Sequence, residues 1–284
     1  MRIAVVGAQG QLGAAIVHAC RSGHDVTPLG HQDLDVTDDH AVTDTIERLR
    51  ADVIVNCAAY NDVDGAEDRP VEALNVNAFA VRALAIATAR FDATLVHYSS
   101  DFVFDGTALT PYTEESPPNP RSVYAASKLL GEWFAGDAPR VYLLRVESLF
   151  GCAPGGRPPK GSVAGILNAL KAGEEWRVFE DRTVSPTFVM DAAHATRQLV
   201  ETGAPFGLYH CVNSGTCTWL ELARELARQL EVEPRLVPVR MADVPLRAER
   251  PQYCALSNQK LQAAGVSMPR WQDALARYLQ TMHA

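Results

Sequence analysis

Residues 2–13 read RIAVVGAQGQLG and run directly into the helical pattern AAIVHAC, residues 14–20. The first five are mostly apolar and β-branched, which predicts a strand that a glycine turn and a helix then follow. Strand, glycine turn and helix in this order are the context of a dinucleotide-binding fingerprint, whose glycines allow a tight turn and close approach to a pyrophosphate. The spacing is Gly-x-x-Gly-x-x-Gly, and a bare glycine triplet can also be only a turn. We predict a dinucleotide site whose first members are Gly7, Gln9, Gly10, Gln11, Leu12 and Gly13.

Further short apolar runs predict strands at residues 25–29, 52–56, 94–98 and 140–146, with helical patterns between them, the longest at 70–90. Repeated βα units with buried apolar strands predict an α/β fold with a doubly wound parallel sheet, as in NAD(P)-binding Rossmann folds. Ligands of such sheets bind at the carboxyl ends of the strands. Four small or polar residues lie at these predicted ends: Gly7, Ala58, Ser99 and Ser100.

The composition of the chain changes after Gly151, where residues 152–161 are rich in glycine and proline. We therefore predict a dinucleotide-binding Rossmann domain over residues 1–150. Residues 151–284 are predicted to form mainly a smaller substrate-binding lobe, with some segments that return to the first domain. In this second part an apolar stripe from Trp219 to Leu230 predicts a core helix, which opens with a capping box of Thr218 and Glu221.

Composition excludes several classes of protein. The 284 residues are 47% hydrophobic and carry a formal net charge of -8, without a run of lysine or arginine. Nucleic acid and anionic membranes are therefore not expected as partners. The N-terminus shows no signal-peptide pattern, and no apolar run approaches the length of a membrane span. The six cysteines form no C-x-x-C pair and the histidines show no ligand spacing, so we expect a cytoplasmic protein without a metal site.

The candidate chemistry lies in residues 97–132, where a strand ends in two serines and a helix begins near Ser122. Tyr124 and Lys128 on this helix are four residues apart, so their side chains share one face. A phenol beside an ammonium can act as an acid/base unit, because the cation favours the phenolate and should lower the tyrosine pKa towards neutrality. The same spacing is also typical of an ordinary half-exposed pair.

The end of the second predicted strand bears on the choice of cofactor. Gly30, His31 and Gln32 offer neither a carboxylate to repel the 2′-phosphate of NADP nor an arginine to attract it. Asp33 and Asp35 follow slightly later, and residues 35–38 can also be read as a helix start with Thr37 or Asp38 as N-cap. The choice between NAD(H) and NADP(H) stays open.

Together these motifs resemble those of the extended short-chain dehydrogenase/reductases, and within them most of all the dTDP-4-dehydrorhamnose reductase group. The resemblance runs nearly end to end. It rests on residues 7–13, 34–38, 56–60, 63–67, 75–77, 99–106, 124–128, 181–187, 207–210 and 250–251, and on the tail 260–279.

The resemblance implies an NADP(H)- or NAD(H)-dependent reductase of the 4-keto group of a nucleotide-linked deoxysugar, converting dTDP-4-dehydrorhamnose to dTDP-rhamnose. In this family Tyr124 would protonate the developing alkoxide, Lys128 would lower the tyrosine pKa and hold the nicotinamide ribose, and Ser100 would bind the substrate oxygen. The protein would act as a monomer or homodimer. Further cofactor-binding residues implied are Asp35, Val36, Cys57, Ala58, Ala59, Tyr60, Asn77, Tyr124 and Lys128. The implied substrate-binding residues are Ser100, Asp101, Phe102, Arg182 and Arg250.

A nucleotide diphosphate needs cations, and Arg182, Arg247 and Arg250 are the candidates, although each can equally be a solvated surface arginine. The chain departs from the group at Ser148, where its members usually have a tryptophan against the sugar. This difference leaves the particular sugar open.

Two alternatives to a reductase remain. An epimerase of the same fold uses nearly the same serine, tyrosine and lysine, whereas a dehydratase would need a second carboxylate where Phe102 follows Asp101. A non-catalytic dinucleotide-binding regulatory subunit is the other alternative. Such a subunit usually loses part of the set, and here Ser100, Tyr124 and Lys128 are all present.

Overall fold

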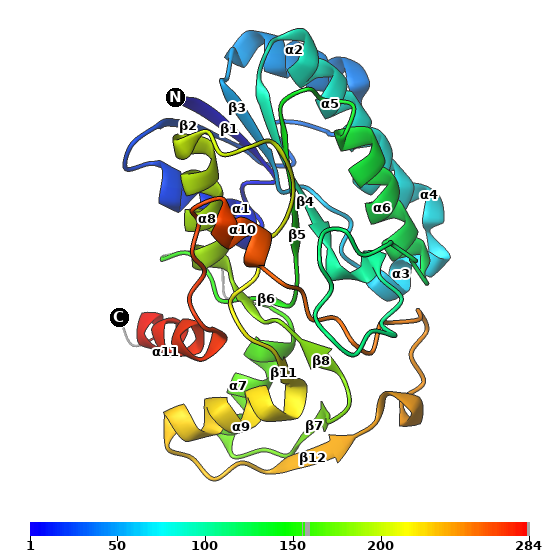
Figure 1. The fold of residues 1–284 in the computed structure, drawn as a ribbon, viewed down its shortest axis with the longest axis vertical. Helices are drawn as coiled ribbons and strands as arrows, with labels where there is room; N and C mark the ends of the chain where they lie inside the picture. The colour runs from blue at the N-terminus through cyan, green and yellow to red at the C-terminus, as the bar shows by residue number, and fades with distance from the viewer. Residues whose placement is uncertain (155, 157–159, 283–284) are drawn as a thin grey trace.

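A six-stranded sheet in which every pairing is parallel forms the centre of the protein (Figure 1). The computed structural model describes residues 1–154, 156 and 160–282. The strands are β1 (Arg2–Val6), β2 (Asp25–Leu29), β3 (Val53–Asn56), β4 (Thr94–Ser100), β5 (Val141–Val146) and β10 (Gly207–His210). Across the sheet their order is β10-β5-β4-β3-β1-β2, so the winding direction reverses between β1 and β3. The predicted doubly wound α/β fold is confirmed, and the reversal marks where such sheets bind ligands.

Helices cover both faces of this sheet because its strands alternate apolar side chains to either side. On one face Ile3 and Val5 pack with α1 (Gln11–Cys20) and α8 (Val189–Thr202). On the other face Ala4 and Val6 pack with α2 (Asp39–Leu49), α5 (Ala80–Arg90) and the end of α6 (Val123–Ala135). The two layers hold the carboxyl ends of the strands at one edge of the molecule.

The long helix predicted over residues 70–90 is interrupted. It consists of α4 (Pro70–Leu74), a π-helical turn η1 (Asn75–Phe79) and α5. Together these residues are long and apolar enough for a membrane span, contrary to the prediction that no such stretch exists. A window of the helix is 56% buried inside the protein, as in a core helix, so this stretch is only weak evidence for a span.

A smaller group of elements lies below the sheet in Figure 1. Its helices are α7 (Ser162–Ala172) and α9 (Trp219–Leu230), and the predicted capping box of Thr218 and Glu221 is confirmed at the start of α9. Its paired strands are β7 (Trp176–Phe179) with β12 (Leu236–Val239), β8 (Thr183–Val184) with β11 (Cys217–Thr218), and β6 (Leu149–Phe150) with β9 (Thr187–Phe188). The remaining elements of the chain are α3 (Val63–Asp68), η2 (Asp101–Val103), η3 (Met241–Asp243), α10 (Gln259–Ala263) and α11 (Trp271–Thr281). Within the glycine- and proline-rich stretch, residues 155 and 157–159 lie outside the described part of the chain.

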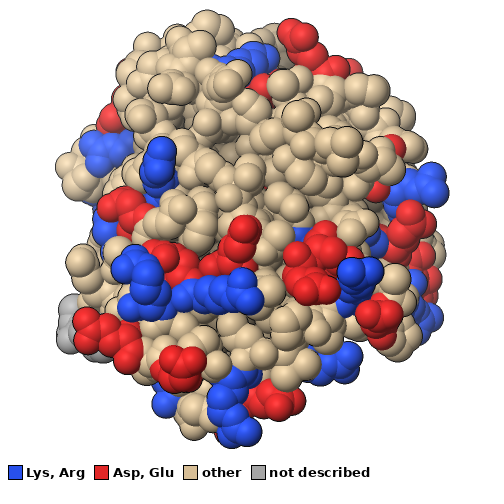
Figure 2. All heavy atoms as spheres, turned by 60° about the horizontal axis from the view of Figure 1, so that its bottom comes forward, with Lys and Arg blue, Asp and Glu red and all other residues tan. Residues whose placement is uncertain are grey.

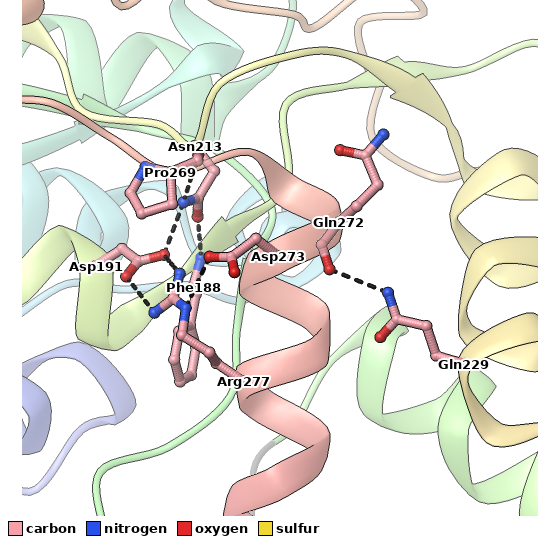
Figure 3. Close-up of polar contacts among 8 residues, drawn as sticks. All are labelled: Phe188, Asp191, Asn213, Gln229, Pro269, Gln272, Asp273 and Arg277. Carbon is pink, nitrogen blue, oxygen red and sulfur yellow. Dashed lines mark hydrogen bonds and ion pairs between the residues drawn. The ribbon is translucent and has the colours of Figure 1, made fainter.

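The C-terminal helix α11 joins the two groups of elements through polar contacts (Figure 3). Arg277 on α11 donates from Nη1 and Nη2 to the two carboxylate oxygens of Asp191 on α8, at 2.6 and 2.7 Å. Asn213 donates to the same carboxylate at 2.7 Å. On the opposite side Gln229 of α9 donates to the carbonyl of Gln272 at 3.0 Å. Helix α11 therefore connects α8, which covers the sheet, with α9, which belongs to the smaller group of elements.

One face of the molecule is visible in Figure 2, where described lysine and arginine side chains lie among aspartate and glutamate. Nucleic acid binding relies on a basic patch or stripe that neutralises phosphates. This face carries a mixture of both signs instead, in a protein whose net charge is -8.

Candidate active site

A cavity of about 620 Å³ opens at the carboxyl ends of the central strands. It extends to the smaller group of elements, at the starts of α7 and α9. Thirteen of the residues predicted from the sequence line it: Gly10, Gln11, Leu12, Gly13, Cys57, Ala58, Ala59, Ser100, Asp101, Phe102, Tyr124, Lys128 and Arg182. They come from segments far apart in the chain, and the parallel sheet brings them together because its strands all end at the same edge.

The glycine turn forms one end of this cavity. Gly7 has a φ of +74°, and a Cβ at this position would lie 2.7 Å from the backbone nitrogen of Ala58. A Cβ on Gly13 would lie 2.3 Å from the carbonyl oxygen of Gly7, so only glycine lets α1 start this close to β1. The N-cap residue Gly10 makes no side-chain cap for α1, and the first-turn residues Gln11, Leu12 and Gly13 line the cavity. This arrangement fits the pyrophosphate of a dinucleotide.

The remaining predicted cofactor residues surround this end without lining the main cavity. Gln9 lies in a neighbouring hollow of about 360 Å³ with Gly30. Asp35 is exposed and accepts hydrogen bonds from the backbone and hydroxyl of Thr37, at 2.9 and 2.7 Å. Val36 packs against the apolar cluster beneath α2 and α5.

The structure places Asp33, which the sequence analysis put slightly after the end of the second strand, back at the end of β2. The chain turns back after this strand, so that Asp33 accepts a hydrogen bond from the backbone N–H of Gly30 at 2.7 Å. The sequence analysis assigned no carboxylate to this strand end because Asp33 lies four residues beyond Leu29, the last residue of β2. In folds of this kind, residues near the end of the second strand bind the 2′-hydroxyl or 2′-phosphate of the cofactor ribose. The turn places the negative charge of Asp33 in this region.

Asn77 supports the site from the π-helical turn rather than lining it. Its side chain accepts from the backbone N–H of Tyr60 at 2.9 Å and donates to the carbonyl of the same residue at 3.0 Å. It also donates to Ser127 at 3.0 Å, whose hydroxyl donates to the carbonyl of Tyr124 at 2.7 Å. Asn77 thus connects the loop of Tyr60, which follows β3, with the helix that carries Tyr124.

Tyr124, Lys128 and Ser100 lie together on the cavity wall, and all three are buried. The ring of Phe102 packs edge-on against Tyr124, with centroids 5.4 Å apart. The ammonium of Lys128 donates to the carbonyl of Tyr98 at 2.6 Å, which fixes the end of the side chain.

The pKa of Tyr124 differs from the prediction. Burial raises this pKa to about 12, a hydrogen bond with Ser100 opposes the rise, and the charge of Asp101 adds to it. Burial also lowers the pKa of Lys128 to about 8. The prediction that the ammonium brings the tyrosine pKa towards neutrality was therefore wrong for this state of the protein, because desolvation dominates the shift. At neutral pH Tyr124 is a protonated phenol and can serve as a proton donor.

Next to Ser100 lies a buried ionic cluster that includes Glu147, which the sequence analysis did not select. Ser100 donates to Asp101 at 2.9 Å. Arg182 donates to the sulfur of Cys254 at 3.5 Å, and its guanidinium lies over the ring of Phe102, 5.6 Å from the centroid. The only signal for Glu147 was a glutamate directly after an apolar strand.

Asp101, Glu147 and Cys254 offer ligand atoms within 4.8 Å of one another, the spacing that could hold a metal ion. The guanidinium of Arg182 already supplies positive charge to this cluster, since it contacts Cys254. Burial raises the pKa of Asp101 and Glu147, and the charge of Arg182 opposes this rise. The group is therefore better described as a buried cluster of charged side chains than as a metal centre.

The other two candidate arginines have carboxylate partners outside the residues that line the cavity. Arg250 donates to Asp64 on α3 at 2.7 Å. Arg247 pairs with Asp68 at the end of the same helix. Of the three arginines predicted for a diphosphate, only Arg182 lies on the cavity wall.

Comparison with known proteins is consistent with this geometry. The family model described as RmlD substrate binding domain matches residues 1–284. The dTDP-4-dehydrorhamnose reductase of Mycobacterium tuberculosis is 37% identical over 287 residues, covering 98% of this chain and 92% of that protein. The crystal structure of a dTDP-4-dehydrorhamnose reductase from Clostridium acetobutylicum has a TM-score of 0.94, with 31% identity and 100% of both chains covered.

A further crystal structure, of dTDP-4-dehydrorhamnose reductase from Bacillus anthracis in complex with NADP, has a TM-score of 0.92, with 30% identity and 98% of each chain covered. These similarities extend over the whole length of the chain. It therefore belongs to the RmlD substrate binding domain family, that of the dTDP-4-dehydrorhamnose reductases, as its motifs predicted.

Proposed function

We propose that this protein reduces the 4-keto group of a nucleotide-linked deoxysugar with NADPH or NADH, and that its substrate is dTDP-4-dehydrorhamnose. The observation that carries the proposal is the complete set of Ser100, Tyr124 and Lys128 on the wall of one cavity whose far end is the glycine turn. The family relatives named as reductases support the same substrate. The free state of all six cysteines suits a reducing, cytoplasmic compartment, and we expect a monomer or homodimer.

The side chains on the cavity wall suggest which part of the reduction each group performs. The bound nicotinamide supplies the hydride. Ser100 holds the carbonyl oxygen of the sugar, and Tyr124 donates its phenolic proton to that oxygen as negative charge develops there. Lys128, fixed by the Tyr98 carbonyl, presents a cation to the cofactor side of the cavity. Phe102 excludes water from one side of the Tyr124 ring.

The direct test is to mix the purified protein with dTDP-4-dehydrorhamnose and NADPH, follow cofactor oxidation and identify the sugar product. Stoichiometric oxidation with formation of dTDP-rhamnose supports the proposal. An epimerase would convert a sugar nucleotide without net consumption of cofactor. Cofactor binding without turnover of any 4-keto sugar nucleotide would indicate a regulatory subunit.

Cofactor preference gives a second prediction. We expect NADPH to be accepted, with kcat/KM values for NADPH and NADH within about a thousandfold of each other, or about 4 kcal/mol. The neutral residues His31 and Gln32 motivate this expectation, while Asp33 opposes a 2′-phosphate. Asp33→Asn should therefore shift the ratio towards NADPH by about tenfold, as expected for removing one nearby charge. A wild-type preference for NADH beyond a thousandfold would contradict the prediction.

The third prediction concerns the substrate diphosphate. If Arg250 leaves Asp64 to bind it, Arg250→Ala should raise KM for the sugar nucleotide by roughly ten- to a hundredfold, the loss of about 1.5–3 kcal/mol from one charge-assisted contact. The Kd for NADPH should stay the same, because the cofactor occupies the other end of the cavity. Arg140→Ala, at the opposite end of β5, is the matched control. An unchanged KM, or a loss of cofactor affinity alone, would place the diphosphate elsewhere.

A further inference from the structure

Two buried polar side chains lie next to each other beneath the cofactor end of the cavity. Asn56 on β3 and His97 on β4 are partners in the register of this parallel pair, so their side chains leave the sheet on the same face. Asn56 is 2% exposed and His97 0%. Asn56 lines the cavity, whereas His97 is not among the described residues that do so. Any effect of His97 on a bound cofactor must therefore pass through another residue.

The hydrogen bonds of Asn56 determine which ring nitrogen of His97 carries the hydrogen. The backbone N–H of Ala58 donates to Oδ1 of Asn56 at 3.1 Å, so this end of the amide must be the oxygen. The other end, Nδ2, lies 3.1 Å from Nδ1 of His97. An amide NH2 group can only donate, so Nδ1 of His97 accepts. The hydrogen of the neutral imidazole is then on Nε2.

His97 can accept from Asn56 only while its ring is neutral. A protonated imidazole donates from both nitrogens, and its Nδ1–H would then face the NH2 group of Asn56. Burial and the nearby charge of Lys128 hold the pKa of His97 well below its usual range, so the ring stays neutral. Nε2 has no hydrogen-bond partner among the described residues. The contact with Asn56 is therefore the one hydrogen bond that the ring makes within the described part of the chain.

The turn of residues 57–59, whose middle N–H is bound by this pair, packs directly on the glycine turn. The backbone N–H of Cys57 donates to the carbonyl of Val6 at 2.9 Å. A Cβ on Gly7 would lie 2.7 Å from the backbone nitrogen of Ala58. The turn also lines the cavity together with the start of α1. A shift of the turn would therefore change the shape of the cavity beside the position expected for the pyrophosphate.

We propose that His97 is a positioning residue for the cofactor. Through Asn56 it holds the turn of residues 57–59 against the glycine turn, in the conformation that binds the dinucleotide. His97 touches neither the cofactor nor the sugar in this arrangement. The inference goes beyond the proposed reduction, because it concerns the affinity for the dinucleotide and does not depend on which sugar is reduced.

Two substitutions separate the acceptor of His97 from the volume of its side chain. His97→Leu keeps a side chain of similar size without an acceptor, whereas His97→Asn is smaller but offers its Oδ1 close to the place of Nδ1. The Kd for NADPH should rise about tenfold in His97→Leu, the effect of losing one hydrogen bond, and stay within about threefold of wild type in His97→Asn. Fluorescence titration measures both values. An equal rise in both variants would overturn the proposal, since it would indicate altered packing.

A double-mutant cycle tests the route through Asn56. Asn56→Ala should raise the Kd for NADPH at least as much as His97→Leu, because it removes the group that binds the N–H of Ala58. If His97 acts only through Asn56, the double variant should bind NADPH as Asn56→Ala does, within about twofold. Effects that add in the double variant would contradict the proposal. His194→Leu, at an exposed position of α8, is the matched control and should keep the wild-type Kd.

A spectroscopic measurement on the wild type needs neither a substrate nor a variant that folds. The nitrogen chemical shifts of the assigned His97 ring in NMR spectra report which nitrogen carries the hydrogen. At neutral pH the ring should be uncharged, with its hydrogen on Nε2. A hydrogen on Nδ1, or a charged ring, would overturn the proposal. Failure of the proposed reductase activity would appear only in turnover assays, so it is distinguishable from failure of this inference.

Discussion

Tyr124→Phe should lower kcat at least roughly a hundredfold, the usual scale for losing a positioned proton donor, while the Kd for NADPH stays unchanged. The substitution removes only the hydroxyl. The ring of phenylalanine keeps the edge-on contact with Phe102 and the apolar packing of Tyr60 and Ala66, so the fold should be retained.

The structure explains why this tyrosine is suited to reduction rather than to the reverse reaction. Its pKa of about 12 keeps the phenol protonated at neutral pH, which is the form that a proton donor needs. Trp133→Phe is the control, because it changes an exposed aromatic side chain on the same helix that does not line the cavity. Steady-state kinetics and cofactor titration of both variants give the answer. Near-normal kcat in Tyr124→Phe would exclude this residue from the mechanism.

The fold could be predicted because each of its signals is local. The apolar run at residues 2–6 and the glycines after it determine one βα unit, and their effect is visible in a single stretch of about twenty residues. The capping box of Thr218 and Glu221 is equally local. The interruption of the helix at η1 was not predictable in this way. It accompanies the contacts of Asn77 with Tyr60 and Ser127, which lie 17 and 50 residues away.

The sequence predicted only those site residues that belong to a recognisable motif. Ser100, Tyr124 and Lys128 follow from the resemblance, and the sheet geometry brings them to one cavity. Glu147 belongs to no motif, and its proximity to Asp101 depends on the register of β4 with β5. The tyrosine pKa was misjudged for a related reason. Spacing on a helix reveals a neighbouring ammonium, but the desolvation that dominates the pKa depends on the packing of the whole protein.

The largest expected effect on stability comes from an ion pair beneath the site. Arg145 on β5 donates to both carboxylate oxygens of Glu132 on α6, at 2.8 and 2.7 Å. Both side chains are buried, 3% and 7% exposed. Glu132→Leu should lower the free energy of unfolding by about 3–5 kcal/mol, because it leaves the guanidinium buried without its counter-charge. His210, the next polar neighbour of Arg145, cannot replace it: burial and Arg145 lower its pKa to about 3, so it stays neutral.

Urea denaturation of three variants separates the charge effect from lost packing. The double variant Glu132→Leu with Arg145→Met removes both charges and should recover most of the loss, because no unpaired ion remains in the interior. Arg228→Ala breaks an exposed arginine–glutamate pair of similar geometry on α9, and should cost far less. If Glu132→Leu were no more destabilising than Arg228→Ala, the guanidinium of Arg145 must reach water or another anion, and the pair would not secure α6 to β5. If the double variant stayed as unstable as the single one, the loss would come from packing around Phe104, over whose ring Arg145 lies at 4.9 Å.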